Sequence, residues 1–158
     1  EKRKPLTMFG KVPELYVDDK VIPQSKAIER FLSRRFGFMG SNEIEAAQIE
    51  AFGEYIRDLV TDYSKVRADE EKKKAFMSKE FIDYMNHIEK HIGNNGFMIG
   101  EKLSWADIQL YYYAFFSVDD ETKQNISAKF PKIHKVVQGV QTNEKIAHWI
   151  KTRPVTNM

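Results

Sequence analysis

The residues of this chain that could do chemistry are concentrated near its start, at Val12-Pro13 and Gln24-Ser25. A helix that begins at Ser25 would leave backbone N–H groups unpaired and carry partial positive charge, so a carboxylate could dock there. Gln24 offers a donor and an acceptor, which suits an amino-acid head group. A cis bond before Pro13 would turn the N–H and C=O of Val12 toward an extended peptide. The two pairs predict a small peptide-like ligand with a carboxylate at one end.

Each pair also has an ordinary structural explanation. Ser25 alone would be a common helix cap, and Pro13 alone would be a common trans proline at a sheet edge. The combination of the two pairs, in this order and spacing, favours a ligand site.

The elements that must position these residues are a hairpin and a helix. Residues 14–17 and 21–22 are rich in β-formers, and Asp18-Asp19-Lys20 between them predicts a tight turn. From Ser25 the apolar residues recur at helical spacing, and Gly37 follows the end of that pattern. The helix should therefore start where the second strand ends.

The remainder of the chain, from Glu43 onward, is expected to be helical. A first long helix should bury one stripe formed by Ile44, Ala47, Ala51, Ile56, Leu59, Val60 and Tyr63. A second helix is expected from Glu70 to Ile92, with Gly93 as its stop. Ser104 and Asp107 form a capping box that should open a core helix. Two shorter helices should follow, from Pro131 to Val140 and from Glu144 to Lys151, the last one capped by Asn143.

Composition excludes several classes of function. The chain has no cysteine, which removes disulfides, thiolate metal sites and a cysteine nucleophile from these 158 residues. A net charge of +2 with interspersed signs does not favour nucleic acid or an anionic membrane. His87 and His91 have a spacing that can bind a metal, but no acidic third ligand shares their face, so no metal is expected. No apolar run is long enough to span a bilayer, and a cytoplasmic location is the default expectation.

The run FGKVPELYVDDKVIPQSKAIERFL resembles the glutathione-binding half of the soluble glutathione transferases, and most closely their sigma class. The resemblance implies an α+β two-domain fold. Residues 1–37 would be part of a thioredoxin-like domain, 38–42 a linker, and 43–158 an all-helical domain.

The resemblance also implies which residues bind glutathione, the co-substrate of the family. These are Lys4, Lys11, Val12, Pro13, Gln24, Ser25 and Asp58. Lys4 and Lys11 would meet the glycyl carboxylate, although glutamine is usual at Lys11. Asp58, on pattern alone a solvated helix aspartate, would reach the glutathione of the second subunit in a homodimer. Tyr63 and Tyr112 are expected to line the pocket for a hydrophobic electrophile.

The family would use a tyrosine in its first strand to ionise the thiol of glutathione. The family also places a strand, a helix and a second strand before the hairpin. None of these is present in the sequence as given, so we expect an N-terminally incomplete chain without its own catalytic residue. The expected function is glutathione conjugation to hydrophobic electrophiles, or isomerisation of a lipid peroxide. The alternatives are a non-catalytic ligand carrier, a crystallin-like structural protein, and an unrelated helical adaptor.

Overall fold

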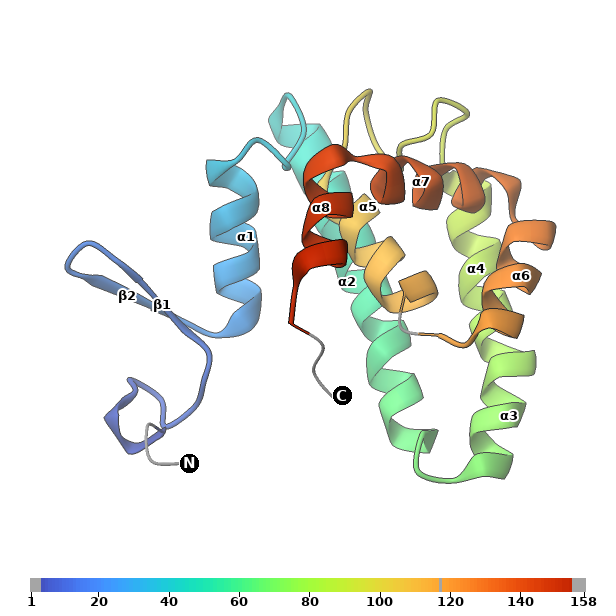
Figure 1. Cartoon of the computed structure of the whole chain (residues 1–158), viewed down its shortest axis with the longest axis horizontal. Coiled ribbons are helices and arrows are strands. Elements are labelled where there is room, and N and C mark those ends of the chain that lie inside the picture. The colour runs from blue at the N-terminus through green and yellow to red at the C-terminus, as the bar shows by residue number, and fades with distance from the viewer. Residues whose placement is uncertain (1–3, 117, 155–158) are drawn as a thin grey trace. The chain divides into compact units, whose positions relative to one another are not determined.

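The computed structural model describes residues 4–116 and 118–154 of the chain. These residues belong to two compact units, Glu1–Met39 and Gly40–Met158. Figure 1 shows the elements of each unit in colour order along the chain. Within the described residues, no helix combines the length and apolar content that crossing a bilayer requires.

The first unit consists of a short turn, a hairpin and a helix. Its elements are η1 (Lys4–Leu6), β1 (Glu14–Val17), β2 (Lys20–Pro23) and α1 (Ser25–Arg35). The two strands are antiparallel, with Leu15 opposite Ile22, and Asp18 takes a positive φ of 52° in the two-residue turn. Gly37, with φ 77°, ends α1 by donating its N–H to the carbonyl of Arg34 at 3.3 Å. The predicted hairpin and helix are confirmed.

The second unit is all helical. Its elements are α2 (Glu43–Val66), α3 (Glu70–Ser78), α4 (Glu80–His91), α5 (Trp105–Leu110), η2 (Tyr111–Phe116), α6 (Asp120–Lys129), α7 (Pro131–Thr142) and α8 (Glu144–Thr152). α5 and α7 contact each other and pack against α2 and α4 respectively. Their facing side chains form the core, which includes Ile49, Ile56, Met85, Ile88, Leu110, Ile133, Val137 and Val140.

The predicted buried stripe of α2 is wrong in its first half. Ile44 is 70% exposed, and Ala47 and Ala51 are exposed as well. The buried residues of this helix are Ile49, Gly53, Ile56 and Leu59. The prediction failed because Gly53 lies on the buried face, and a glycine, which has no side chain, does not mark that face in a hydrophobicity pattern. A Cβ added there would lie 2.4 Å from the Trp105 ring, so α2 and α5 meet at this glycine.

The predicted single helix from Glu70 to Ile92 is also wrong. Lys79 leaves helical geometry, with φ −127° and ψ −75°, and separates α3 from α4. The Ser78 hydroxyl donates to the carbonyl of Ala75 at 2.8 Å, a contact that often bends helices. At the far end α4 ends at His91 and Ile92 is extended with ψ 142°, so the helix stops just before Gly93, as predicted, although Gly93 has no positive φ.

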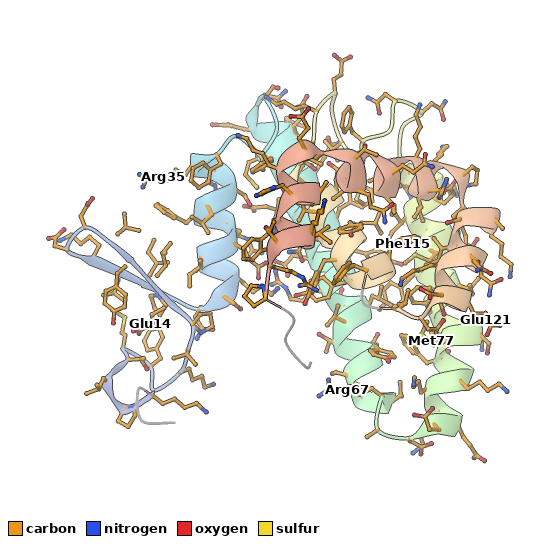
Figure 2. The ribbon with its side chains drawn as sticks, in the orientation of Figure 1. Glu14, Arg35, Arg67, Met77, Phe115 and Glu121 are labelled. Carbon is orange, nitrogen blue, oxygen red and sulfur yellow. The ribbon has the colours of Figure 1, made fainter. Side chains whose placement is uncertain are left out.

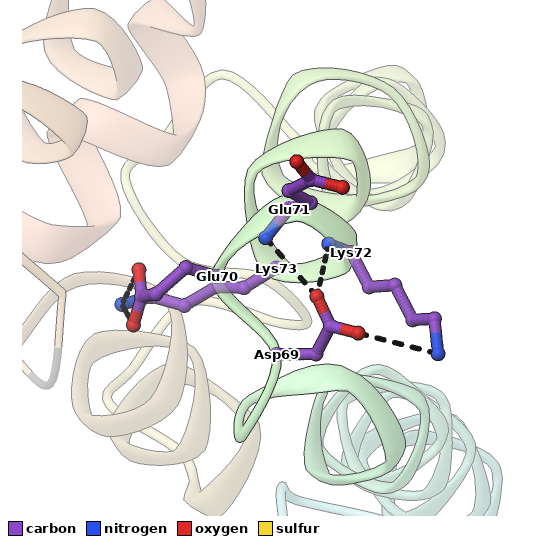
Figure 3. Close-up of polar contacts among 5 residues, drawn as sticks. All are labelled: Asp69, Glu70, Glu71, Lys72 and Lys73. Atoms are coloured by element: carbon purple, nitrogen blue, oxygen red, sulfur yellow. Dashed lines mark hydrogen bonds and ion pairs between the residues drawn. The ribbon is translucent and has the colours of Figure 1, made fainter.

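Asp69 starts α3 by satisfying its first N–H groups (Figure 3). The Asp69 Oδ1 accepts from the N–H groups of Glu71 and Lys72 at 3.1 Å each, and Oδ2 lies 3.3 Å from the Lys72 ammonium. These donors, led by the Lys72 N–H, lower the pKa of Asp69. Lys73 pairs with Glu70 at 3.4 Å one turn along.

The capping box at Ser104 and Asp107 is confirmed. The Asp107 carboxylate is fully buried and accepts from the N–H and hydroxyl of Ser104, both at 2.6 Å. It also accepts from the N–H of Met98 at 2.7 Å, so it fastens the preceding loop to the helix. Burial raises the pKa of Asp107, against the lowering effect of these donors.

The expected core helix after Ser104 changes character half-way. α5 gives way at Tyr111 to η2, a π-helical segment, and α helix does not continue. Tyr111 and Ala114 are buried, as expected of a core helix, whereas Tyr112 is 38% exposed. A π-helical turn shifts the faces of the helix, and such turns are frequent at functional sites.

The N-terminus of α7 is capped by a residue of another helix. Phe130 precedes α7 and provides no side-chain cap. Instead, the two carboxylate oxygens of Glu89 on α4 accept from the N–H groups of Lys132 and Ile133, both at 2.9 Å. The predicted helices after Pro131 and Asn143 are confirmed, and Asn143 caps α8 through the N–H of Ile146 at 3.3 Å.

Candidate functional site

The corner between β2 and α1 has an unusual backbone conformation. Gln24 has φ 72° and ψ 117°, and Ser25 is the first residue of α1. The carbonyl of Gln24 accepts the first helical bond, from the N–H of Ile28 at 3.0 Å. The N–H groups of the first turn have no intrahelical partners, and they carry the positive end of the helix dipole. An anionic head group would gain from both.

The side chains at this corner are available for a ligand. Gln24 is exposed and forms no cap, and neither Gln24 nor Ser25 makes a side-chain hydrogen bond within residues 4–116 and 118–154. A non-glycine residue at positive φ costs about 1–3 kcal/mol and persists where the surroundings impose it, often at binding sites. Gln24 makes no capping bond that would explain this geometry, whereas a role in ligand binding would explain it.

Val12 lies in the same unit, next to the hairpin. The Val12–Pro13 peptide bond is cis, and the Val12 side chain is 55% exposed. In the described part of the chain, the Val12 N–H and C=O have no hydrogen-bond partner, since the β1 ladder starts at Glu14. Lys4, in η1, and Lys11 are both exposed. The first unit therefore contains six of the seven residues predicted to bind glutathione.

Tyr16 is the tyrosine nearest to these residues in sequence, but its environment makes it a poor acid. Its hydroxyl donates to the Glu14 carboxylate at 3.2 Å, and its ring is 66% exposed. The hydrogen bond and the negative charge of Glu14, labelled in Figure 2, raise the pKa of Tyr16. While the Tyr16 hydroxyl donates its hydrogen to this carboxylate, it does not donate it to a thiolate.

Asp58, the seventh residue, lies on an exposed part of α2 in the second unit. No lysine or arginine nitrogen of the described residues lies within 4.0 Å of its carboxylate. Asp62, one turn later, is different, because it pairs with Lys65 at 2.7 Å and accepts from the Tyr84 hydroxyl at 2.8 Å. Burial, then Asp62, raises the pKa of Tyr84. Asp58 therefore has no cationic partner among the described residues, whereas Asp62, one turn later, is paired with Lys65 and Tyr84.

The two predicted pocket residues, Tyr63 and Tyr112, line one cavity of about 420 Å³ in the second unit. Four aromatic side chains are among its described lining residues, and Tyr112 meets Tyr113 edge to face with ring centroids 4.9 Å apart. The described residues that line it are Leu59, Val60, Tyr63, Arg67, Lys73, Met77, Phe81, Tyr112, Tyr113, Val118 and Asp119. The volume is in the range of small-molecule sites.

The histidine pair of α4 has structural partners. The Tyr55 hydroxyl and His87 Nδ1 are hydrogen-bonded at 2.7 Å, and His91 Nδ1 donates to the carbonyl of His87 at 2.8 Å. Among the described side chains, no group of three His, Asp or Glu residues could hold a metal ion.

Family comparison decides between the classes that the geometry leaves open. The model of the glutathione S-transferase C-terminal domain matches residues 54–153. The chain belongs to the glutathione S-transferase family. Among curated members, the haematopoietic prostaglandin D synthase of Gallus gallus is 30% identical over 159 residues, which cover 98% of this chain and 79% of the chicken protein. A probable glutathione S-transferase of Caenorhabditis elegans is 31% identical over 160 residues, covering 94% of this chain and 75% of the nematode protein.

Solved structures of glutathione S-transferases share the fold. The prostaglandin synthase D of Nilaparvata lugens superposes with a TM-score of 0.79 at 34% identity, covering 98% of this chain and 80% of the insect chain. Na-GST-3 of the hookworm Necator americanus, described as monomeric, superposes with a TM-score of 0.86 at 26% identity, covering 99% of this chain and 81% of its own. Membership of the glutathione S-transferase family and the α+β two-domain fold, both expected from the sequence, are confirmed.

Several residues of the cavity escaped sequence reasoning. Arg67 and Met77 are far from Tyr112 in sequence, and only the packing of α2, α3 and η2 brings them to one cavity. Tyr113 follows Tyr112 directly, and in a regular α-helix adjacent residues point about 100° apart. The π-helical geometry of η2 had no recognised signal in the sequence.

Proposed function

We propose that the protein is a glutathione transferase of the sigma class, cytosolic and homodimeric, that conjugates glutathione to hydrophobic electrophiles. Isomerisation of a lipid peroxide is a second activity of the same site. The observation that carries the proposal is Gln24, which directly precedes the first turn of α1 with a strained backbone and no side-chain capping bond.

In this proposal the γ-glutamyl end of glutathione lies at the corner between β2 and α1. Its carboxylate accepts from the Ser25 hydroxyl and from the first-turn N–H groups, where the helix dipole adds a further attraction. The Gln24 amide pairs with the same head group. The Val12 backbone N–H and C=O pair with the cysteinyl unit in the manner of an added strand. Lys4 and Lys11 provide positive charge for the glycyl carboxylate.

The binding residues orient the thiol but do not ionise it. A free thiol has a pKa near 8.5, so keeping it ionised at pH 7 needs a drop of at least about 1.5 pH units, or about 2 kcal/mol. Donors that fix the tripeptide on three sides hold the sulfur in one place, where a single hydroxyl can stabilise the thiolate.

Asp58 is proposed to complete the site of the second subunit. Its carboxylate has no cationic partner among the described residues, and an ammonium group of the partner's glutathione would supply one. Because one relative is described as monomeric, the oligomeric state needs its own measurement. Sedimentation equilibrium should give a dimer, and Asp58→Asn should weaken glutathione binding while the dimer persists.

A non-catalytic ligand carrier with the same fold is the second candidate. Lys11, where the family usually has glutamine, is the feature that favours it. Isothermal titration with glutathione and turnover of 1-chloro-2,4-dinitrobenzene distinguish the two. For the protein with the family's tyrosine-bearing first strand in place, we expect binding together with turnover. We also expect an approximately tenfold weaker Kd for Ser25→Ala, as expected for loss of one hydrogen bond to a charged group. Binding without turnover would support the carrier, and no binding would refute both.

A further inference from the structure

The exposed side of α4 carries two histidines that lie one helical turn apart. His87 and His91 are both exposed, and both line a cavity of about 420 Å³ whose other described lining residues are Ala51, Phe52, Tyr55 and Ile88. Residues four apart on a helix share one face, with their Cβ atoms about 5–6 Å apart. Two imidazole rings at this spacing can therefore bind a single metal ion.

Both rings are held through Nδ1. The Tyr55 hydroxyl lies 2.7 Å from His87 Nδ1, and His91 Nδ1 donates to the carbonyl of His87 at 2.8 Å. Because a carbonyl only accepts hydrogen bonds, neutral His91 has its lone pair on Nε2. Within residues 4–116 and 118–154, neither Nε2 atom has a hydrogen-bond partner. Histidines that bind metal ions have their second ring nitrogen fixed in the same way.

The charges around the pair favour a cation. Burial, and then the negative charges of Asp58 and Asp83, raise the pKa of Tyr55, so its hydroxyl keeps its proton. Both carboxylates are exposed, and no lysine or arginine nitrogen of the described residues lies within 4.0 Å of either. Lys90, three residues after His87, opposes this field, but its long exposed side chain can keep the ammonium in water.

A purely structural role for the histidines is the competing explanation. His91 lies in the last turn of α4, where a positively charged ring offsets the negative end of the helix dipole and bonds a late carbonyl. This role needs neither a second histidine four residues earlier nor an unpartnered Nε2 on each ring. It also predicts that metal ions leave both rings unaffected.

We propose that His87 and His91 bind one divalent transition-metal ion, such as Zn²⁺, through their Nε2 atoms. Imidazole suits zinc, copper and nickel ions, whereas Mg²⁺ and Ca²⁺ prefer oxygen ligands. The described residues provide no third ligand, which is why the sequence predicted no metal, and water completes the coordination shell instead. The site needs no glutathione, so it is independent of the proposed function.

Isothermal titration of the full chain with ZnCl₂ and with MgCl₂ tests this proposal. We expect one Zn²⁺ ion per chain and no measurable binding of Mg²⁺. Loss of an outer-shell partner costs about 10- to 100-fold in metal affinity, so Tyr55→Phe should weaken Zn²⁺ binding about tenfold, and His87→Gln and His91→Gln about 100-fold each. Lys90→Gln should strengthen it about twofold, because a like charge at this spacing is removed. His148→Gln is the matched control, since His148 is exposed and has no histidine within four residues, and it should change nothing.

A second measurement uses the parent protein, so it does not depend on how the variants fold. In ¹⁵N NMR spectra of the histidine side chains, Zn²⁺ should shift the Nε2 signals of His87 and His91 along one binding curve and leave His148 unchanged. Three results would overturn the proposal. They are Zn²⁺ affinity that both pair variants leave unchanged, an equal loss with His148→Gln, and Nε2 signals that do not respond to Zn²⁺.

Discussion

Replacing Gln24 separates the backbone strain at the corner from the chemistry of its side chain. With φ 72° and ψ 117°, any L-residue at this position is strained, and glycine is not. At an ordinary position alanine is more stable than glycine by about 0.5–1 kcal/mol. Here the strain of about 1–3 kcal/mol opposes that preference. We therefore expect Gln24→Gly to be more stable than Gln24→Ala by about 1 kcal/mol, a reversal of the usual sign.

Both substitutions remove the same amide, so both should weaken glutathione binding to a similar degree. Hydrogen bonds to a charged head group are worth about 1.5–3 kcal/mol, which predicts a loss of roughly 10- to 100-fold in affinity. No capping bond is lost, because the Gln24 side chain makes none. Asp18→Gly is the control, since Asp18 also has a positive φ, of 52°, but lies in the hairpin turn. It should leave glutathione affinity unchanged.

Urea unfolding and isothermal titration measure the two effects on the same samples. The strain account is refuted if Gln24→Ala is the more stable variant. The binding account is refuted if both variants bind glutathione as tightly as the parent protein. Different affinities for the two variants would show that backbone geometry, as well as the amide, contributes to the site.

Three further predictions test the packing and electrostatics of the helical unit. Gly53→Ala should destabilise the protein by about 1–3 kcal/mol, because the added Cβ would overlap the Trp105 ring. Gly139→Ala, whose added Cβ would have its nearest contact at 3.8 Å, should stabilise the protein by about 0.5–1 kcal/mol. Urea unfolding midpoints will show whether the two effects have opposite signs. Glu89→Gln should cost about 1–2 kcal/mol, measured in the same way, since one cap bond of α7 and the carboxylate charge are lost. Burial raises the pKa of Asp107 in the folded state above the ordinary 3.8, so the folded state holds this proton to a higher pH than the unfolded state does. The contribution of Asp107 to stability should therefore fall as pH rises from the unfolded-state pKa through the folded-state pKa. The difference in unfolding free energy between the parent protein and Asp107→Asn should show this fall, and a rise with pH would contradict it.

Local signals in the sequence were sufficient for the hairpin, the start of α1 and the capping box. Each depends on residues within a few positions of one another, such as the turn at Asp18 or the box of Ser104 and Asp107. The order of these signals was also sufficient to predict the family, because Val12-Pro13 and Gln24-Ser25 lie at a characteristic spacing within one short unit of the chain.

Features that depend on packing between distant segments were not predictable in this way. The face of α2 that is buried is set by Gly53 against Trp105, and glycine carries no hydrophobic signal. The break at Lys79 and the π-helical η2 oppose otherwise regular helical patterns. The place of Arg67 in the lining of the cavity with Tyr63 and Tyr112 becomes recognisable only when α2, α3 and η2 are assembled.

The most direct test of the central proposal is an NMR titration of the ¹⁵N-labelled protein with glutathione. The account predicts that the amide signals of Val12, Ser25 and Lys26 shift together along one binding curve, and that Ser25→Ala weakens this curve about tenfold. Shifts confined to other residues, or a titration that leaves these three amides unchanged, would contradict the assignment of the glutathione site to the corner between β2 and α1.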